Sequence, residues 1–199
     1  MHRLAAALAR RKQAPDLEAW ETLLLQVARR GGAGVLGTLL QDWQRQAPLE
    51  IVHCQCGQRM TSNGRRVKRL LTILGPAPFA RSFYQCGHCF QTRFPDDEQL
   101  DIVQTGYSPG VRRLMARAGS QTQFEQAAED LLCYAGLELE AREIERVAEE
   151  AGRQVEQWLA SEQEQILHPT SPGQGPPPNP SSSFILALTA QACPCGRSN

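Results

Sequence analysis

Two pairs of closely spaced cysteines most constrain what this chain can fold into. Cys54 and Cys56 lie in "HCQCG", and Cys86 and Cys89 lie in "QCGHC" further along the 199-residue sequence. Short apolar stretches and turn residues fill the segment between them, which predicts a β-hairpin with both pairs at one end. Four thiolates complete a closed tetrahedral shell, which is typical of a structural zinc site. The sequence therefore predicts a zinc ribbon with these four cysteines as the metal ligands.

Two alternatives remain open for this site. The first pair has one intervening residue, whereas the second has the more usual two, so His53 or His88 is an alternative ligand in place of a cysteine. The second alternative is that no metal binds and the four residues are ordinary buried or surface cysteines. If zinc binds, it supplies much of the folding free energy, because so small a segment has little core of its own.

The remaining composition favours metal over disulfides. No signal peptide and no apolar run of about 18 residues is visible, so we expect no membrane segment and a cytoplasmic, nucleoid-associated protein. Thiols stay reduced in that compartment, and an odd total of seven cysteines leaves at least one outside any disulfide. Cys133, among apolar neighbours in "DLLCYAG", is interpreted as a core residue.

Apolar periodicity predicts a mainly α fold with a small β zinc ribbon, that is, an α+β protein. We expect a helical N-terminal region over 1–50, a zinc-ribbon-like module over 51–95, and a helical region over 96–167. Proline and serine dominate 168–199, which predicts a disordered linker and tail. The helical region 96–167 is interpreted as helix-turn-helix-like or as a dimerisation element, which leaves homo-oligomer formation open.

Local signals predict where these elements begin and end. The glycines of "RRGGAG" predict a turn between two amphipathic helices, and "GPAP" predicts the turn between strands "VKRLLTIL" and "FARSFYQC". Ser108 is placed to cap a helix that starts at Pro109, and Gly136 is placed to end the next one. The acidic "PDDEQLD" is interpreted as a solvated loop and helix start.

The charges are unevenly distributed although the formal net charge is zero. Residues 51–94 contain seven basic side chains and no acidic one, which predicts a DNA-binding face, with a solvated basic surface as the alternative. The last predicted helix is rich in glutamate. A DNA duplex would repel this negative charge, so we do not expect the helix to contact the bases. The candidate DNA-binding residues are Arg59, Arg65, Arg66, Lys68, Arg69, Arg81 and Arg93, joined by Arg112 and Arg113.

Several motifs, in order, resemble the N-terminal half of ISKra-type insertion-sequence transposases. They are "CQCG", "GRRVKRLLTILGP", "RSFYQCGHC", "FPDDEQL", "YSPGVRRLMARAG", "FEQAAEDL" and "AEEAG", which together cover about residues 50 to 167. The resemblance implies a zinc-binding, helical front half that engages the element's DNA. It also implies a ribonuclease-H-like catalytic domain after a proline-rich stretch, with Mg²⁺ or Mn²⁺ held by carboxylates. The alternative is a zinc-ribbon and helical adaptor that binds a protein partner.

The tail departs from that family pattern. No catalytic carboxylate set is visible, so we expect no enzymatic activity from this chain alone. Codons for "ALTAQACPCG" (187–196), regrouped from the third base of the first codon, permit Thr-Asp-Gly-Thr-Gly-Val-Pro, which resembles the family's first catalytic motif. We therefore expect a frameshift before the catalytic domain, with chance as the alternative. On this interpretation Cys193 and Cys195 are by-products of the shifted reading frame.

Overall fold

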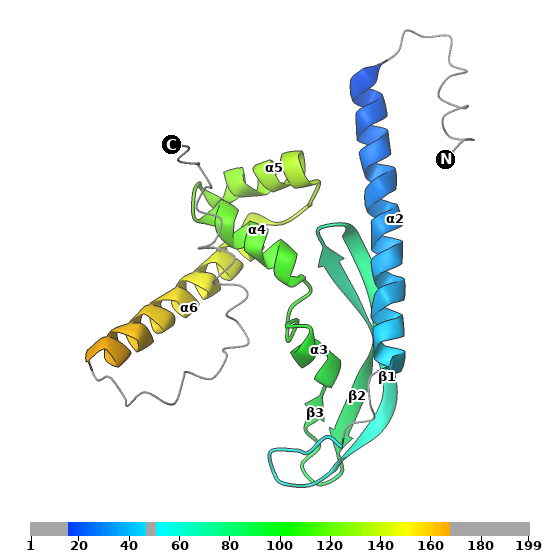
Figure 1. Cartoon of the computed structure of the whole chain (residues 1–199), viewed down its shortest axis with the longest axis vertical. Helices are drawn as coiled ribbons and strands as arrows, with labels where there is room; N and C mark the ends of the chain where they lie inside the picture. The colour runs from blue at the N-terminus through cyan, green and yellow to red at the C-terminus, as the bar shows by residue number, and fades with distance from the viewer. Residues whose placement is uncertain (1–15, 47–50, 168–199) are drawn as a thin grey trace, which may run out of the picture.

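The computed structural model describes residues 16–46 and 51–167, which form five helices and a three-stranded antiparallel sheet (Figure 1). This arrangement confirms the mixed α+β class. The tail over 168–199, including Cys193 and Cys195, lies outside the described residues, as do 1–15 and 47–50. None of the described helices combines the length and apolarity that crossing a bilayer would require.

The first described helix is continuous, so the prediction of two helices joined at "RRGGAG" is wrong. Helix α2 (Leu17–Gln46) has 30 residues and passes through all four glycines. Gly32 lies close to the hairpin turn, since a Cβ there would lie 3.3 Å from the Leu74 side chain, whereas a Cβ at Gly37 would make ordinary contact, at 3.7 Å, with the Pro78 carbonyl oxygen. Packing against strand β2 therefore offsets the roughly 1 kcal/mol that each glycine costs a helix.

The predicted hairpin is present, but its turn lies earlier than "GPAP". Strands β1 (Met60–Thr72) and β2 (Gly75–Cys86) are joined by two residues, and the Thr72 hydroxyl donates to the Gly75 carbonyl oxygen at 2.7 Å. Gly75 has φ 112°, a conformation that favours glycine. Pro76 and Pro78 lie inside β2, which has no neighbouring strand on its outer edge there, so their missing N–H groups leave no ladder bond unmade.

A short strand and a short helix follow the second cysteine pair. Strand β3 (Thr92–Arg93) pairs with the end of β2, and helix α3 (Pro95–Gln99) packs beside the same strand. Leu70, Phe79 and Ile102 form a buried cluster between the hairpin and this segment.

Three helices form a second core beside the turn end of the hairpin (Figure 1). They are α4 (Pro109–Gly119), α5 (Phe124–Ala135) and α6 (Ala141–Leu167), at the positions the sequence predicts. The predicted caps are also confirmed: the Ser108 hydroxyl accepts from the Val111 N–H at 3.3 Å, and Gly136 ends α5 with φ 60°. Cys133 is exposed on α5, so its interpretation as a core residue is wrong.

The hairpin connects the two halves of the molecule. The N–H of Leu71 in β1 donates to the Gly106 carbonyl oxygen at 2.8 Å, and the Ser108 N–H donates to the Leu71 carbonyl oxygen at 2.9 Å. These bonds place the start of α4 against the turn end of the hairpin, while α2 lies along β2 (Figure 1). The cysteine end therefore projects away from the helices α4 to α6.

Candidate metal centre and basic hairpin

Two tight backbone turns present the cysteines at the far end of the hairpin. In the first, the Gly57 N–H donates to the Cys54 carbonyl oxygen at 2.9 Å, and Gly57 has φ 83°. In the second, the Phe90 N–H donates to the Cys86 carbonyl oxygen at 3.1 Å, and Phe90 has φ 59°. Glycine therefore supplies the left-handed residue of the first turn, whereas a non-glycine residue, Phe90, adopts that conformation in the second turn.

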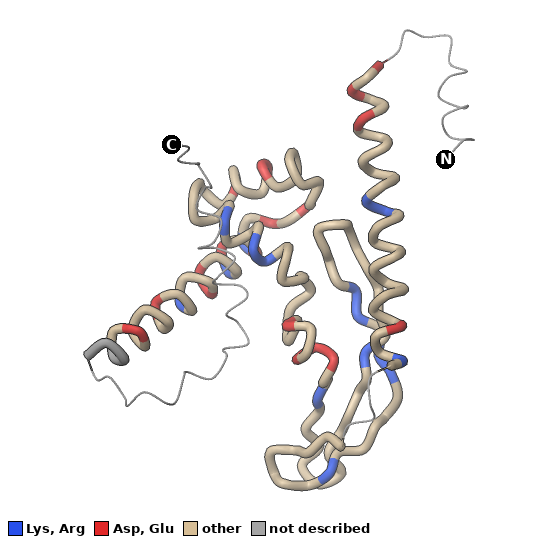
Figure 2. Tube along the Cα trace, viewed as in Figure 1, with Lys and Arg blue, Asp and Glu red and all other residues tan. Residues whose placement is uncertain are grey.

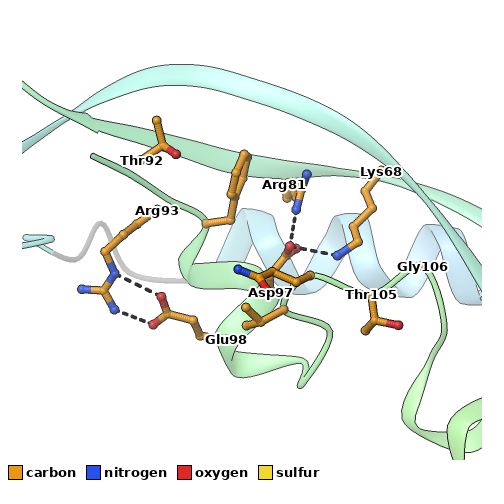
Figure 3. A pocket seen from close by; sticks show the side chains of 11 residues that line it. Lys68, Arg81, Thr92, Arg93, Asp97, Glu98, Thr105 and Gly106 are labelled. Carbon is orange, nitrogen blue, oxygen red and sulfur yellow. Dashed lines mark hydrogen bonds and ion pairs between the residues drawn. The ribbon is translucent and has the colours of Figure 1, made fainter. Parts of the chain in front are cut away.

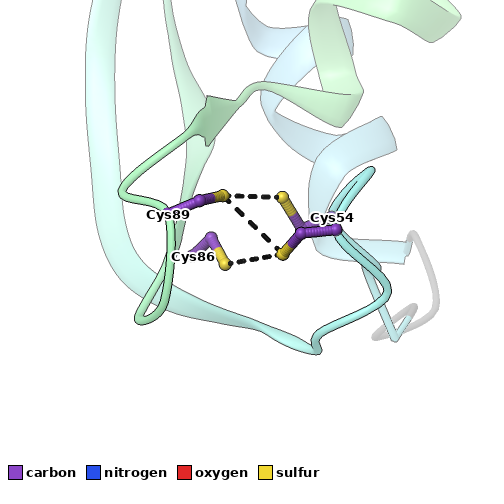
Figure 4. A group of neighbouring side chains, drawn as sticks. Cys54, Cys86 and Cys89 are labelled. Atoms are coloured by element: carbon purple, nitrogen blue, oxygen red, sulfur yellow. Dashed lines mark hydrogen bonds between the residues drawn. The ribbon is translucent and has the colours of Figure 1, made fainter.

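The four cysteines come together, as the sequence predicts (Figure 4). Their Sγ atoms all lie within 4.8 Å of one another, with 3.3 Å between Cys54 and Cys89 and 3.6 Å between Cys56 and Cys86. Four sulfurs about 2.3 Å from a tetrahedral zinc ion would be about 3.8 Å apart, which is close to these separations. A disulfide needs about 2 Å. The cluster can therefore hold a metal ion such as zinc.

The backbone around the cluster favours a thiolate at one position. Backbone N–H groups of Cys89 and His88 hold the pKa of Cys86 at about 6. For Cys89, the backbone at Gln91 acts to lower the pKa, but the Cys54 thiol, burial and the two other thiols outweigh it and raise the pKa to about 12. Adjacent thiols resist sharing several negative charges, and a divalent cation removes that conflict.

The two histidines do not join the cluster. Among the described residues, the group able to hold a metal consists of the four cysteines, and the exposed His53 and His88 are not part of it. The sequence patterns did not predict that Gln91 is part of the site, but its side-chain oxygen lies 3.2 Å from Cys54 Sγ. Its distance from Cys54 along the chain gave no signal of this contact.

Two of the predicted DNA-binding residues, Lys68 and Arg81, are instead partly buried in an ion-pair network (Figure 3). Asp97 of α3 accepts from Lys68 Nζ at 2.9 Å and from the Arg81 guanidinium, and its side chain is only 4% exposed. The Arg81 guanidinium also lies over the Phe94 ring, 3.7 Å from its centroid. Lys68 and Arg81 therefore bind α3 to the sheet and present little charge to solvent.

The acidic "PDDEQLD" is a helix start, as predicted, but its first two carboxylates are not solvated. Asp96 and Asp97 are buried, and Asp96 accepts from Gln44 of α2 and from the Ser82 N–H, each at 2.6 Å. Asp96 and Asp97 supply the negative charge that segment 51–94 lacks. The position of "PDDE" directly after residue 94 was therefore the sequence signal that could have predicted this pairing. The pair ties together α2, α3 and both long strands.

Two further candidates also have carboxylate partners. Arg93 Nε donates to Glu98 at 3.0 Å, and this contact raises the pKa of Arg93 (Figure 3). Arg112 donates to Asp101 at 2.6 Å. Both pairs are more exposed than the network around Asp97, so water competes with them more strongly.

Four candidates remain exposed on the hairpin: Arg59, Arg65, Arg66 and Arg69. Within the described part of the chain, none of them forms an ion pair. Arg65 and Arg69 share one face of β1 with Val67, which is 73% exposed, and Arg66 lies on the other face over the Phe83 ring. Arg113 is half-buried on α4. Figure 2 shows basic positions along the hairpin and many acidic positions on α6.

Comparison with models of known protein families and with curated proteins finds no match to this chain.

Proposed function

We propose that this chain binds DNA through the open face of its hairpin, as the part of an ISKra-type transposase that precedes the catalytic domain. The observation that carries the proposal is the placement of Arg65 and Arg69. Both are exposed on one face of β1, in a segment without acidic residues, and neither forms an ion pair in the described part of the chain. Arg59, nearer the cysteine end, and Arg66, on the opposite face of β1, add further exposed positive charge to the hairpin.

The shape of the hairpin suits a duplex. A two-stranded β-ribbon fits the DNA major groove, which is about 12 Å wide. The ribbon projects beyond the helices at its cysteine end, so a duplex can approach it without contacting the acidic α6 (Figure 2). Guanidinium groups spaced along one strand would contact successive phosphates, and such contacts supply affinity and position more than sequence specificity.

Zinc has a structural role in this proposal. Cys54, Cys56, Cys86 and Cys89 would hold it, leaving no ligand position for water or substrate, and the ion would fix both cysteine turns to each other. Even with four thiolates offsetting the ion to a net −2, the segment 51–94 retains positive charge. Metal binding would keep the arginine-bearing strand rigid and thereby reduce the ordering cost of DNA binding.

Charge reversal tests the proposal. We expect Arg65→Glu/Arg69→Glu to weaken duplex binding strongly and to reduce the slope of log affinity against log salt by about 2, one unit for each lost phosphate contact. The matched control is Arg146→Glu/Arg153→Glu on α6, which makes the same change of net charge beside Glu143 and Glu150. Fluorescence anisotropy across a salt series measures both. Equal affinities and slopes for the two variants would rule out the hairpin as the DNA-binding surface.

The second candidate function is an adaptor that binds a protein partner, and the exposed Val67 favours it. Val67 lies between the two arginines on an edge strand, where an extended peptide can add to a sheet. Val67→Asp would abolish such peptide binding, whereas DNA affinity would fall only modestly. A Val67→Asp variant with unchanged partner binding would remove this candidate.

We also propose that this chain alone does not cleave or join DNA strands. The proposal rests on the resemblance, which assigns that chemistry to a domain after the proline-rich segment. Incubation with a terminal-repeat duplex and Mg²⁺ or Mn²⁺ should leave the strands intact, and metal-dependent nicking by the pure protein would contradict this. Sequencing the gene and its downstream flank tests the frameshift, which requires Asp-Gly-Thr-Gly in the alternative frame.

A further inference from the structure

Helix α2 has two apolar faces, and the sheet covers only one of them. Its buried residues, Ala33, Gly37 and Gln44, face the hairpin. At about 100° per residue, a second stripe lies on the opposite side of the helix. This stripe consists of large apolar side chains that are 37% to 66% exposed: Leu17, Trp20, Leu24, Val27, Val35 and Leu39.

Two glycines of that second face are exposed within the part of the chain that the structure describes. Gly31 and Gly34 follow Val27 along the stripe, and a Cβ added to either would meet no atom within 4 Å. By contrast, Gly32 and Gly37 face the hairpin, and a Cβ at Gly32 would lie only 3.3 Å from the Leu74 side chain. An exposed glycine costs a helix about 1 kcal/mol relative to alanine. Two exposed glycines beside large apolar residues leave room for large side chains of a second surface to pack closely against the helix.

The first half of α2 has little tertiary support, although Arg29 lies close to Gly136 at the end of α5. No residue of the helix before Ala33 is buried. Helices shorter than about 12 to 15 residues are marginal in water unless an apolar face is packed. In Figure 1 this half of α2 extends beyond the turn of the hairpin. Packing of its apolar stripe would supply the missing stability.

We propose that the stripe pairs with the same stripe of a second copy, antiparallel, so that paired residue numbers add up to 51. This register places large residues against small ones. Trp20 lies against Gly31 of the second copy, Leu17 lies against Gly34, and Leu24 lies against Val27. Each contact occurs twice, as a two-fold symmetric interface requires.

The charges on α2 favour the same orientation. Glu18 and Glu21 lie near its start, and Arg29 and Arg30 follow along the helix. Antiparallel pairing brings the acidic start of each helix level with the basic part of the other, which is favourable at long range, although Glu21 and Arg30 lie on opposite edges of the stripe and form no direct pair. Parallel pairing would place Trp20 against Trp20 and like charges at the same level. The stripe is short compared with the roughly 800 Å² per partner of a stable interface, so the dimer dissociates on dilution.

Sedimentation of the full chain without DNA tests this pairing and is independent of the proposed function. The wild type is expected to shift with concentration from 22.0 kDa toward twice that mass. Leu24→Glu and Val27→Lys should each weaken the dimer at least tenfold, since each buries a charge in the interface. Leu25→Glu is the matched control, because Leu25 is equally exposed on α2 but lies off the stripe. Circular dichroism should show that all three variants retain the wild-type fold.

Mixing the two interface variants tests the register. An antiparallel pair with residue numbers adding to 51 places position 24 of the Leu24→Glu chain opposite position 27 of the Val27→Lys chain. The introduced carboxylate and ammonium then face each other once in each mixed dimer, so the mixture should recover dimer formation. In a parallel pair these positions do not face each other, and no recovery follows.

Three results would each overturn the proposal. The first is a wild type that stays monomeric across the micromolar range. The second is a Leu25→Glu variant that disrupts the dimer as strongly as Leu24→Glu does. The third is a mixture of Leu24→Glu and Val27→Lys chains that forms no more dimer than either variant alone.

Discussion

The two ends of this molecule are held together by different physical means. At the helical end, α4, α5 and α6 surround a cluster of buried apolar side chains: Val111, Met115, Ala127, Leu131, Leu137, Ile144 and Val147. At the cysteine end the buried cluster contains only Val52, Cys54, Met60 and Cys86. The helical end can therefore fold by burying apolar surface, whereas the cysteine end buries little and instead brings together four thiols that could hold a metal ion.

A polar joint lies between these two ends. Asp97 and its partners Lys68 and Arg81 connect α3 to both long strands, next to the cluster of Leu70, Phe79 and Ile102. Damage at either end should stay local as long as this joint remains intact. We therefore expect a mutation at the cysteine end to leave the helical end folded, and a mutation at the helical end to leave the cysteine end folded.

If zinc binds as proposed, removing it should have the largest effect, confined to the cysteine end. Structural zinc contributes on the order of 10 kcal/mol in small metal modules, so a chelator or Cys86→Ala should unfold the turns around the four cysteines. Hydrogen exchange should show lost protection at residues 51–62 and 84–93 and retained protection in α4 to α6. The matched control is Cys133→Ala, an exposed cysteine on α5, which should retain one zinc per chain. Full zinc content in Cys86→Ala would contradict the assignment.

Breaking the joint should affect both ends. Asp97→Ala leaves two poorly exposed cations without their carboxylate, which costs about 3 to 5 kcal/mol of unfolding free energy. Glu98→Ala, which removes the more exposed partner of Arg93, should cost at most about 1 kcal/mol. Urea denaturation measures both values. Similar losses for the two variants would show that Asp97 is not the connection between the ends.

Truncation in the helical core should destabilise that end alone. Ile144 is fully buried, so Ile144→Ala should lower its unfolding free energy by about 2 to 5 kcal/mol. Zinc content should stay at the wild-type value, because the cysteine turns lie at the opposite end of the hairpin. Leu159→Ala on α6 is the control, since that side chain is 47% exposed. Loss of zinc in Ile144→Ala would contradict the independence of the two ends.

Removing a helix cap should give the smallest effect. Ser108→Ala deletes the hydroxyl that accepts from the Val111 N–H, which should cost about 1 kcal/mol. Ser120→Ala provides the comparison, because the Ser120 hydroxyl only donates to the Arg117 carbonyl oxygen at the exposed end of α4. Thermal unfolding of the helical end should detect the difference. An equal shift for both variants would mean that the cap at Ser108 contributes nothing specific.

Local chemistry in the sequence was sufficient for the helical end and for the identity of the cysteine cluster. Ser108, Pro109 and Gly136 act on hydrogen bonds within a few residues of themselves, so their patterns predicted the observed caps. The spacing of the two cysteine pairs around a hairpin likewise predicted that four thiols would meet. In each case the residues that decide the structure are neighbours along the chain or flank one hairpin, whose strand pairing brings them together at the same end.

Only the tertiary structure decided which charges and glycines face solvent. Lys68 and Asp97 are 29 residues apart in the sequence, and Gln44 and Asp96 are 52 apart, so no local pattern predicted their pairing. The glycines of α2 predicted a break because glycine weakens an isolated helix, yet packing on β2 keeps the helix continuous. Whether a side chain is buried or forms an ion pair depends on which distant segment packs against it. Local sequence patterns do not specify that packing, because it is decided by the fold as a whole.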